Sequence, residues 1–170
     1  MTTVDKENLD DAIVDGELED EEDSQEGRFL SFKVDNEQYG IEIRHVLEIV
    51  GQQKITDVPD TPDFVKGVIN LRGSVIPVVD IRLRFHMQPR DYDDRTCVIV
   101  VKGHDSSVGI VVDTVNEVIT IPADKISPAP QVSKDEVKRY IKGIGRLENE
   151  VIILLSIEKL LYEHLKQSEK

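Results

Sequence analysis

The chain has 170 residues and a net charge of −13, with 39% hydrophobic residues, no tryptophan and one cysteine. No apolar run approaches the roughly 20 residues of a membrane-spanning helix, no signal peptide is recognisable, and a lone cysteine excludes an internal disulfide. The acidic balance, without a basic stripe that carries interleaved aromatic residues, argues against nucleic-acid binding. These features predict a cytoplasmic protein without direct membrane insertion.

Most of the charge lies in the first 27 residues. They hold twelve acidic residues and one lysine, whereas residues 28–170 have a net charge of only −2. Such a segment cannot bury enough apolar surface to offset its conformational entropy. We therefore predict a disordered acidic tail at 1–27, which is either a solubilising extension or an interaction segment.

The body of the chain has the pattern of short β-strands. Alternating apolar residues in 28–34 ("RFLSFKV") and 39–43 ("YGIEI") predict two strands, joined by a turn at Asp35 and Asn36. A third strand-like run follows at 44–51 ("RHVLEIVG"), and a loop with prolines comes after it. Two further runs flank the tetrad "NLRG" in "FVKGVINLRGSVIPVVDIRLRF".

The same order recurs in the second half of the chain. Residues 97–120 align without gaps on 28–51 at a shift of 69, and residues 140–161 align on 64–85 at a shift of 76. The seven extra residues fall in the second proline loop, where an insertion costs little. A period this long, present only twice, indicates two similar subdomains rather than a solenoid.

The two units, about 29–85 and 97–161, predict a mainly β fold. Each offers about five short strands, which suits a small closed barrel with few free edges. Each unit ends in a helical stretch with a capping residue, Asp80 before "IRLRF" and Ser156 before 157–167. The apolar residues of the C-terminal helix recur at helical spacing and should dock on the body.

Arg72 in the tetrad "NLRG" is a candidate binding residue. The repeat places Glu148 opposite Arg72 and Asn149 opposite Gly73. Because asparagine, like glycine, tolerates a left-handed turn position, we expect the turn to be kept while the charge is reversed. The fold then does not require arginine, and we predict that Arg72 contacts a partner. The alternative is a surface ion pair with a nearby acid.

No catalytic or metal-binding pattern is present. The sequence contains no HExxH, G-x-S-x-G or P-loop motif, and its four histidines lack metal-ligand spacing. Asp57, Asp60 and Asp63 lie in a proline-rich loop, where turn capping is favoured over calcium binding. We therefore predict no enzyme activity, no metal and no cofactor. Two related units instead suit a bridge between two partners.

Four segments carry a resemblance to a known family. "YGIEIRHVLEI", "PDFVKGVINLRGSVIPVVDIRLRF", "VGIVVDTVNEV" and "GIGRLENEVIILLSIEKLL" resemble the chemotaxis coupling proteins of the CheW family. The resemblance covers about 29–161 and implies a CheW-like domain at 28–166, built from two five-stranded SH3-like β-barrels.

The resemblance also implies a function. Proteins of this kind are adaptors that bind the regulatory domain of the histidine kinase CheA and the cytoplasmic tips of methyl-accepting chemoreceptors. The chain would then be a monomer on its own, with ring contacts possible in receptor arrays, and would be recruited from the cytoplasm to arrays at the inner membrane. Two alternatives stay open, a β-barrel sensor of a small ligand and a coupling protein of a pathway that does not control motility.

Two sets of contact residues follow from the resemblance. The receptor-binding set is Val46, Glu48, Ile49 and Arg72. The kinase-binding set, placed on the second unit partly through the internal symmetry, is Val115, Glu117 and Val118. The alternative for the valines is that they are core residues.

Overall fold

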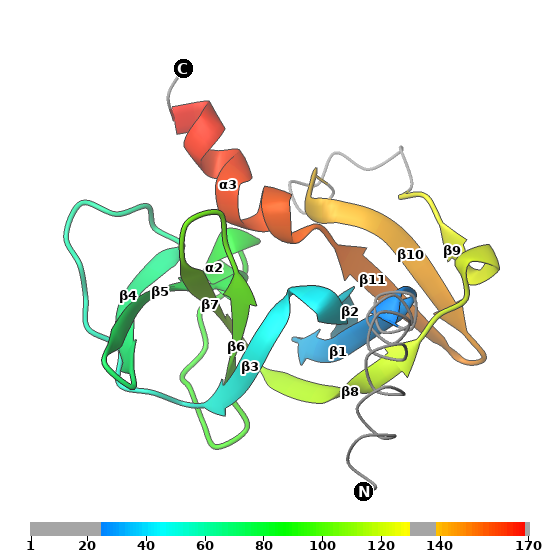
Figure 1. Ribbon diagram of the computed structural model, residues 1–170, viewed down its shortest axis with the longest axis horizontal. Coiled ribbons are helices and arrows are strands. Elements are labelled where there is room, and N and C mark those ends of the chain that lie inside the picture. Colours follow the sequence, from blue (N-terminus) through cyan, green and yellow to red (C-terminus); the bar gives the residue numbers. More distant parts are fainter. Residues whose placement is uncertain (1–24, 130–138, 169–170) are drawn as a thin grey trace, which may run out of the picture.

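The computed structural model describes residues 25–129 and 139–168, so most of the predicted tail at 1–27 lies outside the described residues. Two β-sheets lie side by side, with few helices (Figure 1). The strands are β1 (Arg28–Val34), β2 (Glu37–Glu42), β3 (Val46–Gly51), β4 (Val65–Leu71), β5 (Ser74–Asp80), β6 (Cys97–Lys102), β7 (Ser107–Val112), β8 (Thr114–Thr120), β9 (Ile126–Ser127), β10 (Ile141–Leu147) and β11 (Glu150–Leu155). The helices are η1 (Ile43–His45), α2 (Ile81–Arg84), η2 (Ala123–Lys125) and α3 (Ile157–Ser168).

Each sheet forms a small barrel. The sheet of barrel 1 has the order β3-β6-β7-β5-β4, and that of barrel 2 has the order β8-β1-β2-β11-β10-β9. The short strand β9 pairs with β10 through Ser127 and Ile144. In barrel 1 the same role falls to an isolated bridge between Thr56 and Val68, so the two barrels differ little. The predicted mainly β fold with two SH3-like barrels is confirmed.

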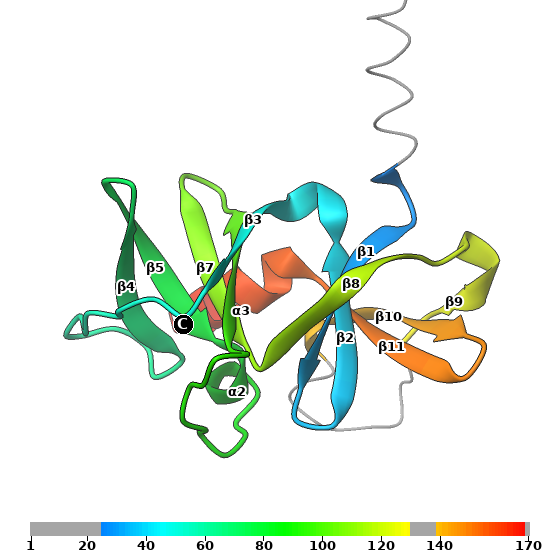
Figure 2. The same ribbon diagram turned by 90° about the horizontal axis from the view of Figure 1, so that it is seen from below.

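The expectation that each repeat unit forms its own barrel is wrong. Strands β1 and β2 of the first unit belong to barrel 2, and strands β6 and β7 of the second unit belong to barrel 1. The exchange is reciprocal, because β2 lies parallel to β11 and β7 lies parallel to β5. Figure 2 shows β8 leaving the region of barrel 1 and running along barrel 2. Each barrel therefore contains strands from both halves of the chain.

The burial pattern of the exchanged strands explains this arrangement. On β6, Val98 and Val100 point into a cluster inside barrel 1, whereas Ile99 and Val101 belong to a large cluster between the barrels. On β1, Phe29 contributes to the cluster of barrel 2, and its neighbours contribute to the central cluster. A strand that is buried on both faces must be apolar on both faces. The continuous run "CVIVV" satisfies this requirement, which an alternating surface strand would not.

Glycine permits the closest of these strand contacts. Gly109 on β7 lies opposite Val78 on β5, and a Cβ atom at Gly109 would come within 2.7 Å of a Val98 methyl group. The repeat places Gly40 at the corresponding contact, opposite Leu154, where a Cβ atom would lie 3.1 Å from two side chains. The shared glycines therefore serve the parallel contacts that join the two halves of the chain.

The two predicted helix caps are present. The Asp80 carboxylate accepts a hydrogen bond from the backbone N–H of Arg82 at 2.8 Å, and the Ser156 hydroxyl accepts one from Lys159 at 3.3 Å. Helix α3 lies over the junction of the barrels (Figure 1), where Leu160 is fully buried in the central cluster. Its docking joins the end of the chain to both barrels.

A buried ion pair also ties the halves together. Arg82 donates two hydrogen bonds to Asp113, at 2.9 and 2.7 Å, and approaches Asp35 at 3.4 Å. Burial by itself would raise the pKa of Asp113, but the hydrogen bonds and positive charge of Arg82, with the backbone N–H of Asp35 and the charge of Arg90, hold that pKa below its usual value. The ionised carboxylate is therefore part of the folded structure.

Candidate partner-binding site

The tip of the β4–β5 hairpin has an unusual backbone. Leu71 pairs with Ser74, so that Arg72 and Gly73 form a two-residue turn, with φ of +51° and +89°. Positive φ at both central positions defines a type I′ turn, which favours asparagine followed by glycine. The side chain of Asn70 supports the turn by accepting a hydrogen bond from the Gly73 N–H at 3.0 Å. An exposed arginine thus occupies a left-handed position that most residues avoid.

Arg72 forms an ion pair with Glu48 across the end of barrel 1. Glu48 lies on β3 directly after a β-bulge, because Val46 pairs with Val101 while Glu48 pairs with the next residue, Val100. Bulges of this kind redirect side chains. Here the bulge leaves Leu47 unpaired and 50% exposed beside the ion pair.

The ion pair and its neighbours surround an open hollow of about 670 Å³, which we call the partner hollow. Its lining combines the charged pair with two exposed apolar side chains, Leu47 and Val75, the second of which is 65% exposed. The hollow is lined by Leu47, Glu48, Leu71, Arg72, Ser74, Val75, Ile76, Val100, Ser106 and Ser107. Apolar anchors beside a few charges are typical of a surface that binds another protein.

The structure separates the four residues of the predicted receptor-binding set. Glu48 and Arg72 are bonded to each other and line the partner hollow. Val46 is half-buried and packs against the central cluster, as the alternative interpretation expected. Ile49 is 42% exposed on β3 but is not part of the lining of the hollow. The first two residues therefore have the geometry of a contact site.

Leu47 and Val75 were missed by the sequence analysis. Val75 is the second residue after the turn, and alternation along β5 turns Ile76 inward and Val75 outward, so the pattern contained a signal for it. Leu47 had no such signal, because its exposure depends on the bulge against β6. A register shift between distant strands cannot be read from one segment alone.

The corresponding surface of barrel 2 is closed by hydrogen bonds. The side-chain amide of Gln38 donates to Glu150, and Asn116 donates to Gln38 at 3.3 Å. In the repeat, Asn116 stands at the position of Leu47, and Glu150 at the position of Ser74. Polar side chains therefore bridge the place where barrel 1 presents an apolar side chain and a small hydroxyl.

The two hairpin tips also differ in their backbone. Neither Glu148 nor Asn149 has a positive φ, although they connect Leu147 to Glu150 through two residues. The expectation that Asn149 keeps the left-handed turn is therefore wrong. Arg72 differs from its counterpart Glu148 in charge and also in conformation, so of these two corresponding hairpin tips only that of barrel 1 has the left-handed turn.

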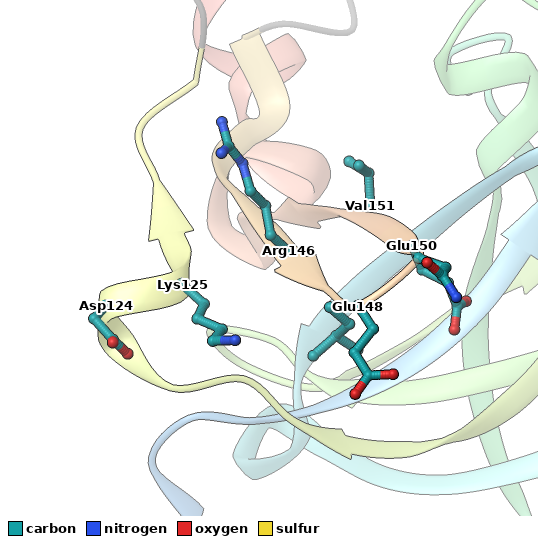
Figure 3. A pocket seen from close by; sticks show the side chains of 8 residues that line it. Asp124, Lys125, Arg146, Glu148, Glu150 and Val151 are labelled. Atoms are coloured by element: carbon teal, nitrogen blue, oxygen red, sulfur yellow. The ribbon is translucent and has the colours of Figure 1, made fainter.

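A second hollow, the tip hollow, lies beside the β10–β11 hairpin. Figure 3 shows Lys125 extending toward this hairpin, which carries Arg146, Glu148 and Glu150. Val151 is 56% exposed at its edge. Charges of both signs line this hollow, and the described contacts include no ion pair equivalent to that of Arg72 and Glu48.

The predicted kinase-binding set lies on β8, at one edge of the barrel 2 sheet. Val115 is half-buried and packs against the central cluster. Glu117 is exposed, and its backbone N–H and carbonyl group are both hydrogen-bonded to the hydroxyl of buried Ser31. Val118 is 42% exposed. Glu117 and Val118 are thus accessible to a partner, and Val115 packs the strand against the central cluster.

Two further findings concern the described residues. In 25–129 and 139–168, no group of three or more His, Cys, Asp or Glu side chains is placed to hold a metal ion. Over the same residues, no helix is both long and apolar enough to span a membrane.

The fold and the site define a class of protein: a two-barrel β protein that offers a surface for another protein. Comparison with known proteins agrees with this class. The family described as the CheW-like domain matches residues 28–164. The chain therefore belongs to the CheW family. Members of this family are scaffolding adaptors rather than enzymes, which confirms the prediction that the chain is not an enzyme.

Individual relatives show how much of the chain is shared. The chain is 45% identical to chemotaxis protein CheW of Klebsiella aerogenes over 133 residues, which cover 78% of this chain and 80% of that protein. It is 34% identical to chemotaxis protein CheW of Helicobacter pylori over 142 residues, or 83% and 86% of the two chains. The crystal structure of scaffolding protein TtCheW from Thermoanaerobacter tengcongensis superposes with a TM-score of 0.73 at 34% identity, over 80% of this chain and 92% of that one.

Proposed function

We propose that the chain is a non-enzymatic adaptor of chemotaxis signalling that couples methyl-accepting chemoreceptors to the histidine kinase CheA. Its family membership supports the adaptor role, and its two different barrel surfaces support two different partners. In this role the protein acts in the cytoplasm and is recruited to receptor arrays at the inner membrane. Many modest contacts in such an array would add up through multivalency.

The receptor contact is assigned to the partner hollow. The observation that carries this assignment is the pair of Arg72 and Glu48, flanked by exposed Leu47 and Val75. A helical receptor tip could place apolar side chains on Leu47 and Val75. Its carboxylate or carbonyl groups could bond to the planar guanidinium of Arg72, which is well suited to them.

The kinase contact is assigned to the exposed part of β8. Glu117 and Val118 are accessible at the edge of barrel 2, and Val115 fixes the strand against the central cluster. The two contacts then lie on different barrels, which would let one molecule hold both partners at once. Ring contacts between barrels of neighbouring proteins belong to the same proposal.

Calorimetric titration tests the adaptor role directly. The full chain should bind a cytoplasmic receptor fragment and the CheA regulatory domain in separate titrations, with each partner leaving the binding of the other intact. Absence of heat with both partners at tens of micromolar would contradict the proposal.

A charge exchange separates the role of Arg72 from the role of its ion pair. Arg72→Glu alone should weaken receptor binding at least tenfold. In the double variant Arg72→Glu with Glu48→Arg, the ion pair is restored in reverse, and the proposal expects binding to stay weak because the partner meets the wrong charges. Full recovery in the double variant would show that the pair only shapes the barrel. Glu148→Arg in barrel 2 is the matched control and should leave receptor binding unchanged.

A further inference from the structure

The turn between β6 and β7 (residues 103–106) forms one wall of the partner hollow. Ser106 and Ser107, where this turn enters β7, line the hollow together with Val100 of β6. The repeat aligns Ser107 with Gln38 of barrel 2, whose longer side chain bonds to Glu150. Because both serine side chains are short, the position of the wall in barrel 1 is set by the backbone of the turn.

Helix α3 holds the β6–β7 turn through two side chains. The hydroxyl of Tyr162 accepts a hydrogen bond from the backbone N–H of His104 at 2.8 Å. The rings of these two residues are stacked with their centres 3.9 Å apart, and Nε2 of His104 lies 2.8 Å from the carboxylate of Glu158. A Cβ atom at Gly103 would come within 2.6 Å of the Tyr162 hydroxyl oxygen, so this hydroxyl lies directly against the backbone of the turn.

The first turns of α3 are in turn fixed to the body of the protein. Leu160 is fully buried in the central cluster, and Arg84, itself 4% exposed, donates from Nε to the carbonyl group of Leu160 at 2.7 Å. The guanidinium carbon of Arg84 lies 4.1 Å from the ring centre of Phe64 and 4.6 Å from that of Tyr140, within the range of a cation–π interaction. The helix is therefore a firm support for the side chains that reach the β6–β7 turn.

The first repeat unit contains the same connection with the charges exchanged. Asp35, in the turn between β1 and β2, is the counterpart of His104, and Arg82, the second residue of α2, is the counterpart of Glu158, the second residue of α3. Arg82 approaches Asp35 at 3.4 Å, and the backbone N–H of Asp35 donates to the side chain of Asp113 at 2.8 Å. In each unit, the helix at its end thus bonds to the turn of its first hairpin, so this connection is retained although neither charge is.

We propose that Tyr162 and Glu158 are positioning residues for the receptor contact, because they hold the β6–β7 turn where Ser106 and Ser107 complete the partner hollow. This inference rests on the proposed assignment of the receptor to that hollow. Neither Tyr162 nor Glu158 lines the hollow, so their effect on binding passes through the turn. A wall that is held in place beforehand spares the receptor the entropic cost of ordering it.

The variant Tyr162→Phe removes the hydrogen bond to His104 and keeps the aromatic ring. In calorimetric titration of the full chain, it should weaken binding of a cytoplasmic receptor fragment about fivefold, the effect of one ordinary hydrogen bond. Binding of the CheA regulatory domain should be unchanged, because that contact is assigned to barrel 2. Receptor binding equal to that of the wild type, or equal weakening with both partners, would overturn the positioning role.

The variant Tyr92→Phe is the matched control, because it removes a tyrosine hydroxyl elsewhere in barrel 1. This hydroxyl donates to buried Asp80 at 2.6 Å, so its loss should lower the midpoint of thermal unfolding more than Tyr162→Phe does. The contacts described for Tyr92 include none to the β6–β7 turn, and receptor binding should stay at the wild-type level. If receptor binding instead falls in step with stability in the two variants, Tyr162 has only a structural role.

Amide NMR spectra without any partner test the position of the turn by itself. In Tyr162→Phe, the amide signals of His104, Ser106 and Ser107 should shift, and the His104 amide should exchange faster with solvent. Unchanged signals of both serines would overturn the proposal, because the wall would then not depend on α3. A wild-type chain that does not bind the receptor fragment would instead contradict the proposed function on which this inference rests.

Discussion

Barrel 1 and barrel 2 share a strand plan but differ at the surfaces where strands end. At the tip of barrel 1, Arg72 has a left-handed backbone and pairs with Glu48 beside exposed Leu47. At the same place in barrel 2, Glu148 has a negative φ, and a chain of amide hydrogen bonds that includes Asn116 spans the surface. The two repeat units thus share the barrel fold but differ in the side chains that are exposed at this tip.

The difference teaches where function lies in a duplicated fold. Residues that both units retain, such as the paired glycines and the capped helices, serve strand packing and chain reversal. Residues that differ between the units are not required for strand packing or chain reversal. A strained, charged residue at an exposed tip is costly to retain, which supports a role in binding rather than in folding.

The largest expected effect is on folding of the separated halves. Because each barrel contains strands of both units, a fragment of residues 25–96 should lack a cooperative thermal transition by circular dichroism. Mixing it with a fragment of residues 97–170 should restore a transition, since the central cluster needs strands from both. A cooperative transition in the first fragment alone would contradict the exchanged topology.

Removing the buried ion pair of Arg82 and Asp113 should give the second largest effect, a loss of folding stability. Asp113→Asn should lower the free energy of unfolding by about 3 kcal/mol, because it leaves a buried guanidinium with a weaker partner. The pKa of Asp113 lies below its usual value in the folded protein, so its stabilisation is fully present above the pKa of the unfolded carboxyl group and is lost as the pH falls toward and through the lower folded pKa. Urea titrations between pH 7 and pH 3 should show the gap between wild type and variant closing at the acid end.

The barrel comparison supplies the control for this pair. The repeat places Glu158 at the position of Arg82, where it bonds to His104 at 2.8 Å with both side chains largely exposed. Exposed pairs contribute about 0–1 kcal/mol, so Glu158→Gln should have a much smaller effect on unfolding. Equal losses in both variants would show that burial does not distinguish the two sites.

The partner hollow gives a third contrast. Val75→Asp should weaken binding of a receptor fragment by about 2 kcal/mol, or roughly 30-fold, because it places a charge where an apolar anchor is expected. Val151→Asp is the same change at the same strand position of barrel 2 and should weaken receptor binding less than threefold. Calorimetric titration measures both, and equal weakening would remove the reason to assign the receptor to barrel 1.

The smallest effect concerns the turn itself. Arg72→Asn creates the preferred Asn-Gly pair of a type I′ turn but also removes a weak surface ion pair. We expect the gain to exceed the loss, so that the free energy of unfolding rises by about 0.5 kcal/mol. Glu148→Asn, in a turn with negative φ, should give no gain. Chemical unfolding measures both, and a gain at Glu148 alone would contradict the strain assigned to Arg72.

The sequence by itself determined the local features of this protein. Alternating apolar residues, turn residues and helix caps act over a few positions, and the internal repeat showed that two similar barrels were to be expected. The charge reversal at Arg72 was also visible, and it led to a residue that lines the partner hollow. Each of these signals is contained in a short segment or in a comparison of two segments.

Tertiary structure alone decided which strands pair and which side chains reach the surface. The exchange of β1 and β2 for β6 and β7 depends on burying both faces of these strands at once, a condition that involves residues far apart in the chain. The exposure of Leu47 depends on its register against β6, and the φ of Arg72 depends on how its hairpin twists. Local pattern cannot fix these properties, because they arise from contacts between segments that the sequence keeps apart.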